Sequence, residues 1–253
     1  MTSTPSARAV QQYAGTTGNL TARIALHSYG TNPQDWFAWL AARLPAAGEV
    51  LEAGAGTGKL WTQVAHDRLR LTLTDFSPAM CAQLATVPGA RVVRCDASGL
   101  PFAEAGFDTV IANHMLYHVD DPLAALREFA RVLRPGGRVA VATNGRHHLA
   151  ELDEVGAAIG RGDLGQWRFQ NDFSAETGPG LVGQVFRDVR VERYPCDLRV
   201  PAAAPVLAYL ESMAAGPLSA PERSAVQDIV QARIAADGVF RVRKHTVLIT
   251  AVR

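Results

Sequence analysis

Three glycines at alternate positions, Gly54, Gly56 and Gly58, mark the part of this 253-residue chain best suited to holding a ligand. They follow a short apolar run and the acidic residue Glu52, and helix-forming sequence resumes after them. Glycine adopts backbone angles that are closed to other residues, and its missing side chain lets a ligand lie against the main chain. The stretch therefore predicts a strand, a tight turn that carries a flat or extended ligand, and the start of a helix.

The spacing of these glycines separates the ligand classes that use such turns. The phosphate loop of nucleotide hydrolases needs a glycine where Ala53 stands and a hydroxyl residue where Leu60 stands. The dinucleotide fingerprint, counted from Gly54, needs a glycine at the position of Lys59. The pattern that remains is acidic-x-Gly-x-Gly-x-Gly, and the rest of the chain must identify its ligand.

The composition indicates an ordinary globular protein with a small ligand. The chain is 48% hydrophobic and 19% charged, and its formal net charge is +1. Bulk electrostatics therefore give no reason to expect a nucleic acid or an anionic membrane as partner. The sequence has no apolar run near the roughly 18 to 20 residues that cross a bilayer, and its start lacks the order of a signal peptide, so we expect a cytoplasmic protein.

Predicted strands and helices alternate through the middle of the chain. After the strand that ends at Glu52 we expect strands over 69–74, 91–94, 107–112 and 138–143, separated by helices over 60–66, 78–86 and 122–133. This alternation predicts an α/β fold with a parallel, doubly wound sheet and a ligand at the carboxyl ends of its strands. Two helices are expected within 19–44.

The pattern loosens after Asn144. We expect a helix over 147–159, a strand over 186–194, two helices over 203–215 and 221–236, and a terminal strand or hairpin over 239–252. The last pair of helices reads as an insertion before the final strand.

The ordered segments resemble the motifs of class I S-adenosylmethionine (SAM) dependent methyltransferases over roughly residues 50–143. They read Val-Leu-Glu-Ala-Gly-Ala-Gly-Thr-Gly, Leu-Thr-Asp-Phe-Ser-Pro-Ala-Met, Arg-Cys-Asp-Ala, Phe-Asp-Thr-Val-Ile-Ala-Asn-His-Met-Leu-Tyr-His-Val and Leu-Arg-Pro-Gly-Gly-Arg-Val. The resemblance implies a Rossmann-like sheet of seven strands with helices on both faces. Glu52 departs from the pattern, because the family more often has Asp there.

The resemblance also assigns roles in SAM binding. Asp75, about 20 residues beyond the glycines, is placed to accept hydrogen bonds from the ribose or to cap a helix, although Ser77 is the better cap. Asp96 could accept from the adenine amino group, and Glu52 could pair with the ammonium or fix the glycine turn. Phe76 and Met80 either contact the adenine or pack in the core. The predicted cofactor contacts are Glu52, Gly54, Ala55, Gly56, Asp75, Phe76, Met80, Asp96, Ala97, Asn113, Arg23 and Tyr13.

Two flanking regions resemble the variable parts of small-molecule methyltransferases. Residues 1–45 look like a helical lid, in which Arg23 could meet the methionine carboxylate and His27, Tyr29 or Tyr13 could close over the donor or acceptor. Surface or packing roles are the alternative for each. Residues 46–253 would form the SAM-binding domain, with the acceptor pocket and insertion in about 145–236. Within that region the aromatic residues expected to set specificity are His147, His148, Trp167, Phe169 and Phe173.

Methyl transfer requires two aligned partners and, for a hydroxyl or an acidic carbon, removal of a proton. His114 and His118 follow the strand over 107–112, where the transferred methyl group is expected. His114 is either the general base or a pocket wall, His118 has a structural or positioning role, and His27 is a third catalytic candidate. The pair at i and i+4 has no third ligand at companion spacing, so no metal is expected.

These observations predict a SAM-dependent methyltransferase that acts on a small, specialised metabolite and releases S-adenosylhomocysteine. Two alternatives stay open: an enzyme of the same fold that catalyses cyclisation, decarboxylation or rearrangement, and a non-catalytic SAM-binding partner protein. A nucleic-acid methyltransferase is disfavoured, because Asn113-His-Met-Leu stands where a base-flipping Asn-Pro-Pro-Tyr motif would be. Oxygen, nitrogen or carbon as acceptor atom, and a monomer or a homodimer, are equally compatible with the sequence.

Overall fold

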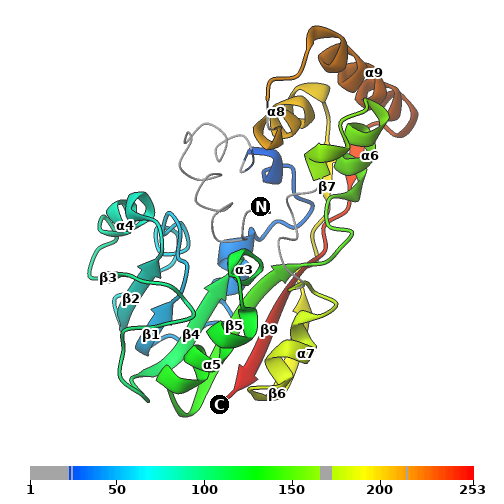
Figure 1. Ribbon diagram of the computed structural model, residues 1–253. Coiled ribbons are helices and arrows are strands. Elements are labelled where there is room, and N and C mark those ends of the chain that lie inside the picture. Colours follow the sequence, from blue (N-terminus) through cyan, green and yellow to red (C-terminus); the bar gives the residue numbers. More distant parts are fainter. Residues whose placement is uncertain (1–22, 24, 166–172, 215) are drawn as a thin grey trace.

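The computed structural model describes residue 23 and residues 25–165, 173–214 and 216–253, and it contains one large sheet (Figure 1). The seven strands lie in the order β3-β2-β1-β4-β5-β9-β6. Their bounds are β1 Gly48–Glu52, β2 Leu69–Asp75, β3 Arg91–Arg94, β4 Phe107–Asn113, β5 Leu133–Asn144, β6 Arg187–Arg193 and β9 Thr246–Val252. The predicted seven-stranded α/β sheet is confirmed.

The sheet is mixed rather than wholly parallel. Strands β1 to β5 pair in parallel, whereas β9 is antiparallel to both of its neighbours, β5 and β6. The chain enters β9 at the carboxyl edge of the sheet, so β9 has to run back toward the opposite edge. The prediction of a parallel sheet therefore holds for β1 to β5 only.

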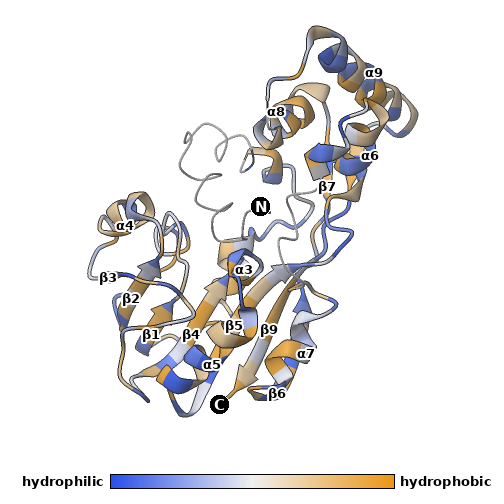
Figure 2. Ribbon diagram, viewed as in Figure 1, coloured by the Kyte–Doolittle hydropathy of each residue, from blue (hydrophilic) through white to orange (hydrophobic). Residues whose placement is uncertain are grey.

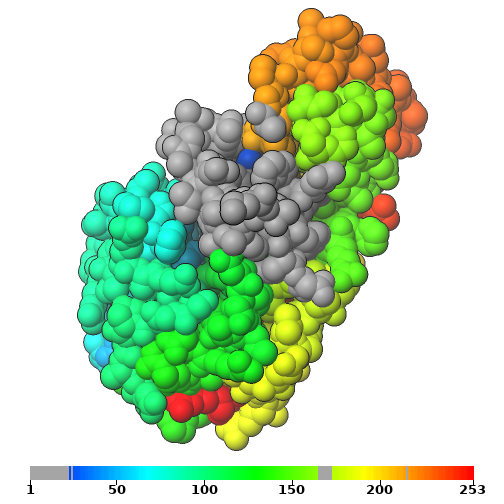
Figure 3. All heavy atoms as spheres, viewed as in Figure 1, coloured from blue at the N-terminus to red at the C-terminus, as the bar shows by residue number. Residues whose placement is uncertain are grey.

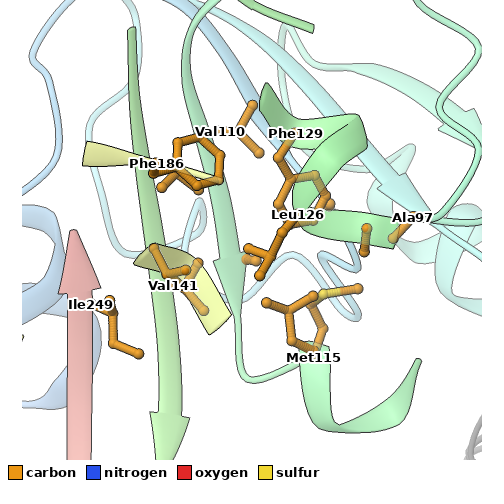
Figure 4. Close-up of a cluster of buried hydrophobic side chains, with 14 of the residues drawn as sticks. Ala97, Val110, Met115, Leu126, Phe129, Val141, Phe186 and Ile249 are labelled. Atoms are coloured by element: carbon orange, nitrogen blue, oxygen red, sulfur yellow. The ribbon is translucent and has the colours of Figure 1, made fainter. Parts of the chain in front are cut away.

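Apolar side chains cover both faces of the sheet, as successive strand residues point to opposite sides. In β4, Val110 belongs to one buried cluster and Ile111 to another. The first cluster packs under α5 (Pro122–Val132) through Phe129 (Figure 4). It also packs under α7 (Gly178–Gly183) through Val182. The second packs under α3 (Trp36–Ala41) and α4 (Pro78–Leu84). Helices on both faces confirm the doubly wound arrangement.

Residues 149–165, 198–214 and 216–242 build a second, smaller body with its own core, which we call the cap. It contains α6 (Ala150–Ala158), the short helix η2 (Gly162–Gly165), α8 (Ala203–Met213) and α9 (Ala220–Asp237), and a two-stranded sheet of β7 (Leu198–Val200) and β8 (Phe240–Val242). The cap projects from the sheet as a separate lobe beyond the carboxyl ends of the strands (Figures 1 and 3). Buried apolar residues from each of these elements form its core. The ribbons of α8 and α9 carry both hydrophobic and hydrophilic stretches (Figure 2).

Two predicted elements differ from the structure, and strand β7 was not predicted at all. Residues 60–66 form successive turns instead of a helix, with Trp61 N donating to Gly58 O at 2.9 Å. The segment 239–252 is not a hairpin, because β8 pairs with β7 in the cap while β9 joins the main sheet. Strand β7 was not predicted, since three residues give too short an alternation to recognise. The inserted pair of helices before the final strand is confirmed as α8 and α9.

Among the described residues, no helix has the length and apolar character needed to cross a membrane. Three residues of the sequence analysis, Tyr13, Trp167 and Phe169, lie outside the described part of the chain.

Candidate functional site

A cavity of about 350 Å³ opens at the carboxyl ends of β1, β2, β3 and β4. Ten predicted cofactor residues line it, together with two of the predicted catalytic histidines. They are Glu52, Gly54, Ala55, Gly56, Asp75, Phe76, Met80, Asp96, Ala97 and Asn113, with His114 and His118. A cavity of this size is typical of small-molecule sites.

The glycine turn forms the floor of this cavity in the left-handed conformation. Gly54, Gly56 and Gly58 have φ angles of 63°, 58° and 71°. A Cβ atom on Gly54 would stand 2.8 Å from the Cβ of Met115, so the turn packs closely against the segment after β4. A Cβ on Gly56 would meet nothing within 4 Å, because that residue faces the open cavity. A side chain at position 56 would therefore project into the cavity, and glycine leaves the main chain of this turn, which we call the glycine cradle, open to a ligand.

Asp75 connects the glycine turn to the next helix. Its Oδ2 accepts from Gly56 N at 3.0 Å and its Oδ1 accepts from Ser77 N at 2.8 Å, while Ser77 caps α4 as expected. Burial raises the pKa of Asp75, and the hydrogen bonds from the main chain oppose this shift. Both oxygens keep lone pairs that a hydroxyl of a ligand can use.

Glu52 lies at the end of β1 with 2% of its surface exposed. One carboxylate oxygen accepts from Trp61 Nε1 at 2.5 Å, which holds the turns after the glycines against β1. Burial raises the pKa of Glu52 to about 8, so the carboxyl group carries a proton near neutral pH. A cation bound beside it would favour the ionised form.

The other end of the cavity offers an apolar platform with acidic groups beside it. Phe76 is 49% exposed and is therefore a surface of the cavity and not a core residue. The guanidinium carbon of Arg94 lies 6.0 Å from the Phe76 ring centroid. Asp96 accepts from Ser98 N at 2.7 Å, which fixes its carboxylate at the rim. Met80 and Ala97 complete this wall.

His114 follows β4 in the left-handed conformation, with φ 58°. Its main-chain N donates to Ala142 O at 3.1 Å, and its ring centroid lies 5.3 Å from that of Trp36. Burial, followed by the charges of Lys244 and His118, lowers the pKa of His114 to about 3. The ring is therefore neutral at physiological pH, and its buried Nδ1 has no hydrogen-bond partner among the described residues.

His118 lies one turn further on, in the short helix η1 (Leu116–His118), and its ring centroid is 4.5 Å from that of Tyr117. The neighbouring Asn113 accepts from Trp36 Nε1 at 3.1 Å through its Oδ1. Trp36, a partly buried residue packed against the cluster under α3 and α4, thus orients a group of the cavity wall.

The structure does not bring Arg23 and His27 to this cavity. The guanidinium of Arg23 donates to Ser212 O of α8 at 2.7 Å, so it faces the cap and not the glycine turn. His27 is more than a third exposed and lies outside the lining of this cavity.

Two residues expected in the acceptor pocket have structural positions instead. Phe173 is fully buried in the cluster under α5 and α7. His148 is buried, and its Nδ1 accepts from His245 N at 3.1 Å, while His147 is exposed. Their aromatic side chains suggested a role in the acceptor pocket, but aromatic side chains are equally suited to a buried core.

The sequence analysis missed several residues of the cavity. They include Phe37, Thr57, Lys59, Met115, Tyr117 and Asp120. Lys59 is the most informative, because it is one of only two lysines in the chain, the other being Lys244. Among the described residues no group of three His, Cys, Asp or Glu side chains is placed to hold a metal ion.

Comparison with known proteins identifies the domain. Residues 51–141 match the family model of the methyltransferase domain. An uncharacterized methyltransferase of Mycobacterium tuberculosis is 37% identical over 137 residues, which cover 53% of this chain and 54% of that protein. The chain thus spans about half the length of the curated relatives it matches.

Solved structures extend the similarity in fold to the cap. The phosphoethanolamine N-methyltransferase 2 of Haemonchus contortus, in complex with S-adenosyl-L-methionine, is 18% identical with a TM-score of 0.58, covering 96% of this chain and 59% of its own. The cyclase SpnF is 21% identical with a TM-score of 0.60, covering 99% of this chain and 97% of its own. Residues 51–141 thus match the methyltransferase domain family, and the motif order and the glycine cradle agree with this match.

Proposed function

We propose that this protein transfers the methyl group of SAM to a small-molecule acceptor and releases S-adenosylhomocysteine. The observation that carries the proposal is the clamp in which Asp75 accepts from the amide of Gly56, inside a cavity that has an exposed apolar platform at one end. SAM supplies a methyl group on a sulfonium centre, and the protein's task is to hold that centre in line with a nucleophile.

Each part of the cavity suits one part of SAM. Phe76, Met80 and Ala97 offer apolar contact to an adenine, and Asp96 offers an acceptor for its amino group. Asp75 has lone pairs for the ribose hydroxyls. Glu52 would take the ammonium at the opposite side of the glycine turn.

Lys59 is the one lysine or arginine among the described residues that line the cavity, and it suits the methionine carboxylate. Arg23, which the sequence analysis assigned to that carboxylate, is engaged by Ser212. The methyl end of the cofactor would then lie toward Asn113 and His114, at the end of β4.

His114 is the base candidate that the geometry supports best. Its ring is neutral at physiological pH and can accept a proton, but its low pKa makes it a weak base while the acceptor site is empty. Burial is the main cause of that low pKa, so an acceptor that brings a negative charge near the ring would make His114 more basic. His118 and Tyr117 support the ring from the same loop.

Calorimetric titration with SAM and S-adenosylhomocysteine tests the proposal, with NAD as the control ligand. We expect micromolar binding of both sulfur ligands, and loss of binding in Asp75→Ala, because the clamp on Gly56 is removed. Asp67→Ala is the matched control, since Asp67 is exposed in the turn before β2. Binding of NAD without SAM would contradict the proposal.

Labelled SAM then separates methyl transfer from the other reactions of this fold. Transfer of label from the methyl group to a small acceptor identifies a methyltransferase. Consumption of an acceptor with no loss of label from SAM would identify a non-methylating enzyme.

A further inference from the structure

Trp61 is a buried residue next to the cofactor cavity. It follows the glycine turn, 2% of its surface is exposed, and it belongs to the apolar cluster under α3 and α4. Its Nε1 donates to Glu52 Oε2 at 2.5 Å, and Glu52 lines the cavity. Trp61 is not itself part of the lining, so its influence on a ligand has to pass through Glu52.

The surroundings of Trp61 fix its indole ring in one position. Its main-chain N donates to Gly58 O at 2.9 Å, which ties the residue to the glycine turn. The ring of His66 packs edge-on against the indole, with the ring centroids 5.8 Å apart. The two ring nitrogens of His66 lie 2.9 and 3.1 Å from main-chain carbonyl oxygens, which fix that ring as well. These contacts hold the indole N–H on the carboxyl group of Glu52.

Glu52 is a buried carboxyl group with no basic partner among the described residues. Only 2% of its surface is exposed, and Trp61 supplies the one hydrogen bond that a described residue donates to its side chain. A carboxyl group that is removed from water and has a single neutral donor favours its protonated form. Burial accordingly raises the pKa of Glu52 to about 8, although the hydrogen bond from Trp61 opposes this shift, and the charge of Asp75 adds to the rise.

Other titratable groups reach the surroundings of Glu52 from each element that borders the cavity. Lys59 lies on the turn, Asp75 at the end of β2 and His114 after β4, while His66 lies behind the indole. The remaining titratable groups of the lining are Cys95, Asp96, His118 and Asp120. Among all of these, Asp75 is the group whose charge contributes to the raised pKa of Glu52. A cation bound in the cavity would act against both burial and Asp75.

We propose that Trp61 is a positioning residue of the cofactor site, and that its indole N–H holds the Glu52 carboxyl group so that SAM binds with release of one proton from Glu52. The inference rests on the methyltransferase function proposed above, in which Glu52 pairs with the ammonium of SAM. The proton passes from the carboxyl oxygen to water, and the ammonium keeps its own protons. The carboxylate then accepts from both the indole and the ammonium, and no covalent bond of SAM changes.

Cofactor binding should therefore strengthen as the pH rises. Where Glu52 is protonated before binding, a ligand that takes its ionised form releases one proton, and the affinity rises up to about tenfold per pH unit. The rise should end near pH 8, because Glu52 is then ionised before the ligand arrives. The indole N–H favours the ionised form, so removal of this donor should move the end of the rise to higher pH.

Calorimetry in buffers of different ionisation enthalpy counts the protons that are released on binding. S-Adenosylhomocysteine is the ligand, at about pH 6 to 7.5, where its amine is protonated. Methylthioadenosine, which lacks the amino-acid end, is the control ligand. For the wild-type protein we expect about one proton per S-adenosylhomocysteine at about pH 6.5, none for methylthioadenosine, and an affinity for S-adenosylhomocysteine that rises roughly fivefold to tenfold from pH 6 to 7.

Two variants separate the roles of the acid and the indole. Glu52→Gln should release no proton and bind S-adenosylhomocysteine with an affinity that varies less than about twofold over this range. Trp61→Phe should still release the proton, but it should bind S-adenosylhomocysteine about tenfold more weakly at pH 7, since one hydrogen bond to a charged group is lost. Its pH profile should move to higher pH, and its affinity for methylthioadenosine should stay unchanged.

Trp39→Phe is the matched control for loss of a buried indole. Trp39 is 4% exposed in the same cluster, and its indole N–H donates to no cavity residue among those described. We expect its proton count and its pH profile to equal those of the wild-type protein, even if its stability falls.

The indole N–H signals of the four tryptophans give a test that does not require Trp61→Phe to fold. In the wild-type protein without ligand, one signal should move with a midpoint near pH 8, as Glu52 ionises. The same signal should stay fixed over this range when S-adenosylhomocysteine is bound. No signal should show this movement in Glu52→Gln, in which His66 still titrates.

Three results would overturn the inference. They are binding of S-adenosylhomocysteine without proton release, a proton count that is unchanged in Glu52→Gln, and a Trp61→Phe variant that weakens both ligands equally while its pH profile stays in place. A wild-type protein that binds neither SAM nor S-adenosylhomocysteine at any pH in this range would instead contradict the methyltransferase function itself.

Discussion

The cofactor cavity and the cap differ in what holds them together. The cavity is formed by a glycine turn and by residues at the ends of β1, β2, β3 and β4, so the main chain fixes its shape. The cap is held together by buried side chains of α6, α8 and α9 around the two-stranded sheet of β7 and β8. Backbone changes should therefore disturb the first region, and side-chain or cap changes the second.

Truncation of a residue in the core of the cap should have the largest effect on the free energy of unfolding, and it should leave the cofactor cavity intact. Leu210 of α8 is 1% exposed within the cap cluster, which is distinct from the two clusters of the sheet. Leu210→Ala should lower the free energy of unfolding of the cap by about 2 to 5 kcal/mol. SAM affinity, measured by calorimetry, should change less than about twofold, while methylation of the acceptor falls sharply.

The partly buried Leu207 on the same helix provides the control, because Leu207→Ala opens a smaller cavity. Denaturant unfolding followed by fluorescence and by circular dichroism compares the two variants. If SAM affinity falls in parallel with stability, the cap and the sheet unfold as one cooperative unit and the contrast between the regions is wrong.

A methyl group added to the glycine turn should weaken cofactor binding beyond its effect on stability. Gly56 and Gly89 both have positive φ, at 58° and 72°, and a Cβ on either would meet nothing within 4 Å. Each change to Ala should therefore cost a similar 1 to 2 kcal/mol, as a rough figure, in stability. Only Gly56→Ala places the methyl group in the cavity, where we expect SAM binding to weaken about a hundredfold, which is about 2.7 kcal/mol.

Calorimetry and thermal unfolding on this pair separate conformational strain from blocking of the site. Equal SAM affinities in the two variants would show that the ligand does not lie on the Gly56 amide.

The same contrast explains which features could be predicted from the sequence. The strands β1 to β5 and many residues that line the cavity follow from local signals: apolar runs, alternate glycines, and acidic residues that immediately follow a strand. Asp75 is recognisable because a strand of alternating Leu and Thr ends there. Such signals require no knowledge of distant parts of the chain.

The features that were missed depend on tertiary pairing. No local sequence pattern distinguishes Lys244 from other loop residues. Only the junction of residues 29–31 with 197–199 brings it near His27. Strand β9 is antiparallel because the cap delivers the chain to the carboxyl edge, which no local pattern records. Phe173 was assigned to a pocket on its aromatic character, although burial in the core satisfies that character equally well.

The buried acid of the cofactor cavity should give the empty protein a dependence of stability on pH. The folded state raises the pKa of Glu52 from the ordinary 4.5 to about 8 through burial, so between these values it binds more protons than the unfolded chain does. The free energy of unfolding should therefore fall as pH rises from about 5 to 8, by at most about 1.4 kcal/mol per pH unit.

Glu52→Gln should flatten this dependence, and denaturant titrations at several pH values measure it. The matched control is Glu154→Gln in the cap, a site that is more than a third exposed. An unchanged slope in Glu52→Gln would show that other groups account for the dependence.

The smallest expected effect concerns the two large apolar side chains that the described structure exposes. Phe76 is 49% exposed at the cofactor cavity, and Val191 is 47% exposed on the edge strand β6. Truncation of either should alter the free energy of unfolding by less than about 0.5 kcal/mol, because little buried area is lost. For Phe76→Ala we expect SAM binding to weaken by about 1 kcal/mol, roughly fivefold, since an aromatic platform contributes that much to a stacked ring. Val191→Ala should bind SAM normally. Calorimetry on both variants tests whether the exposed ring contacts the adenine. If Phe76→Ala binds SAM as tightly as Val191→Ala does, the adenine lies elsewhere in the cavity. Met80 and Ala97 are then the next residues to test as the adenine platform.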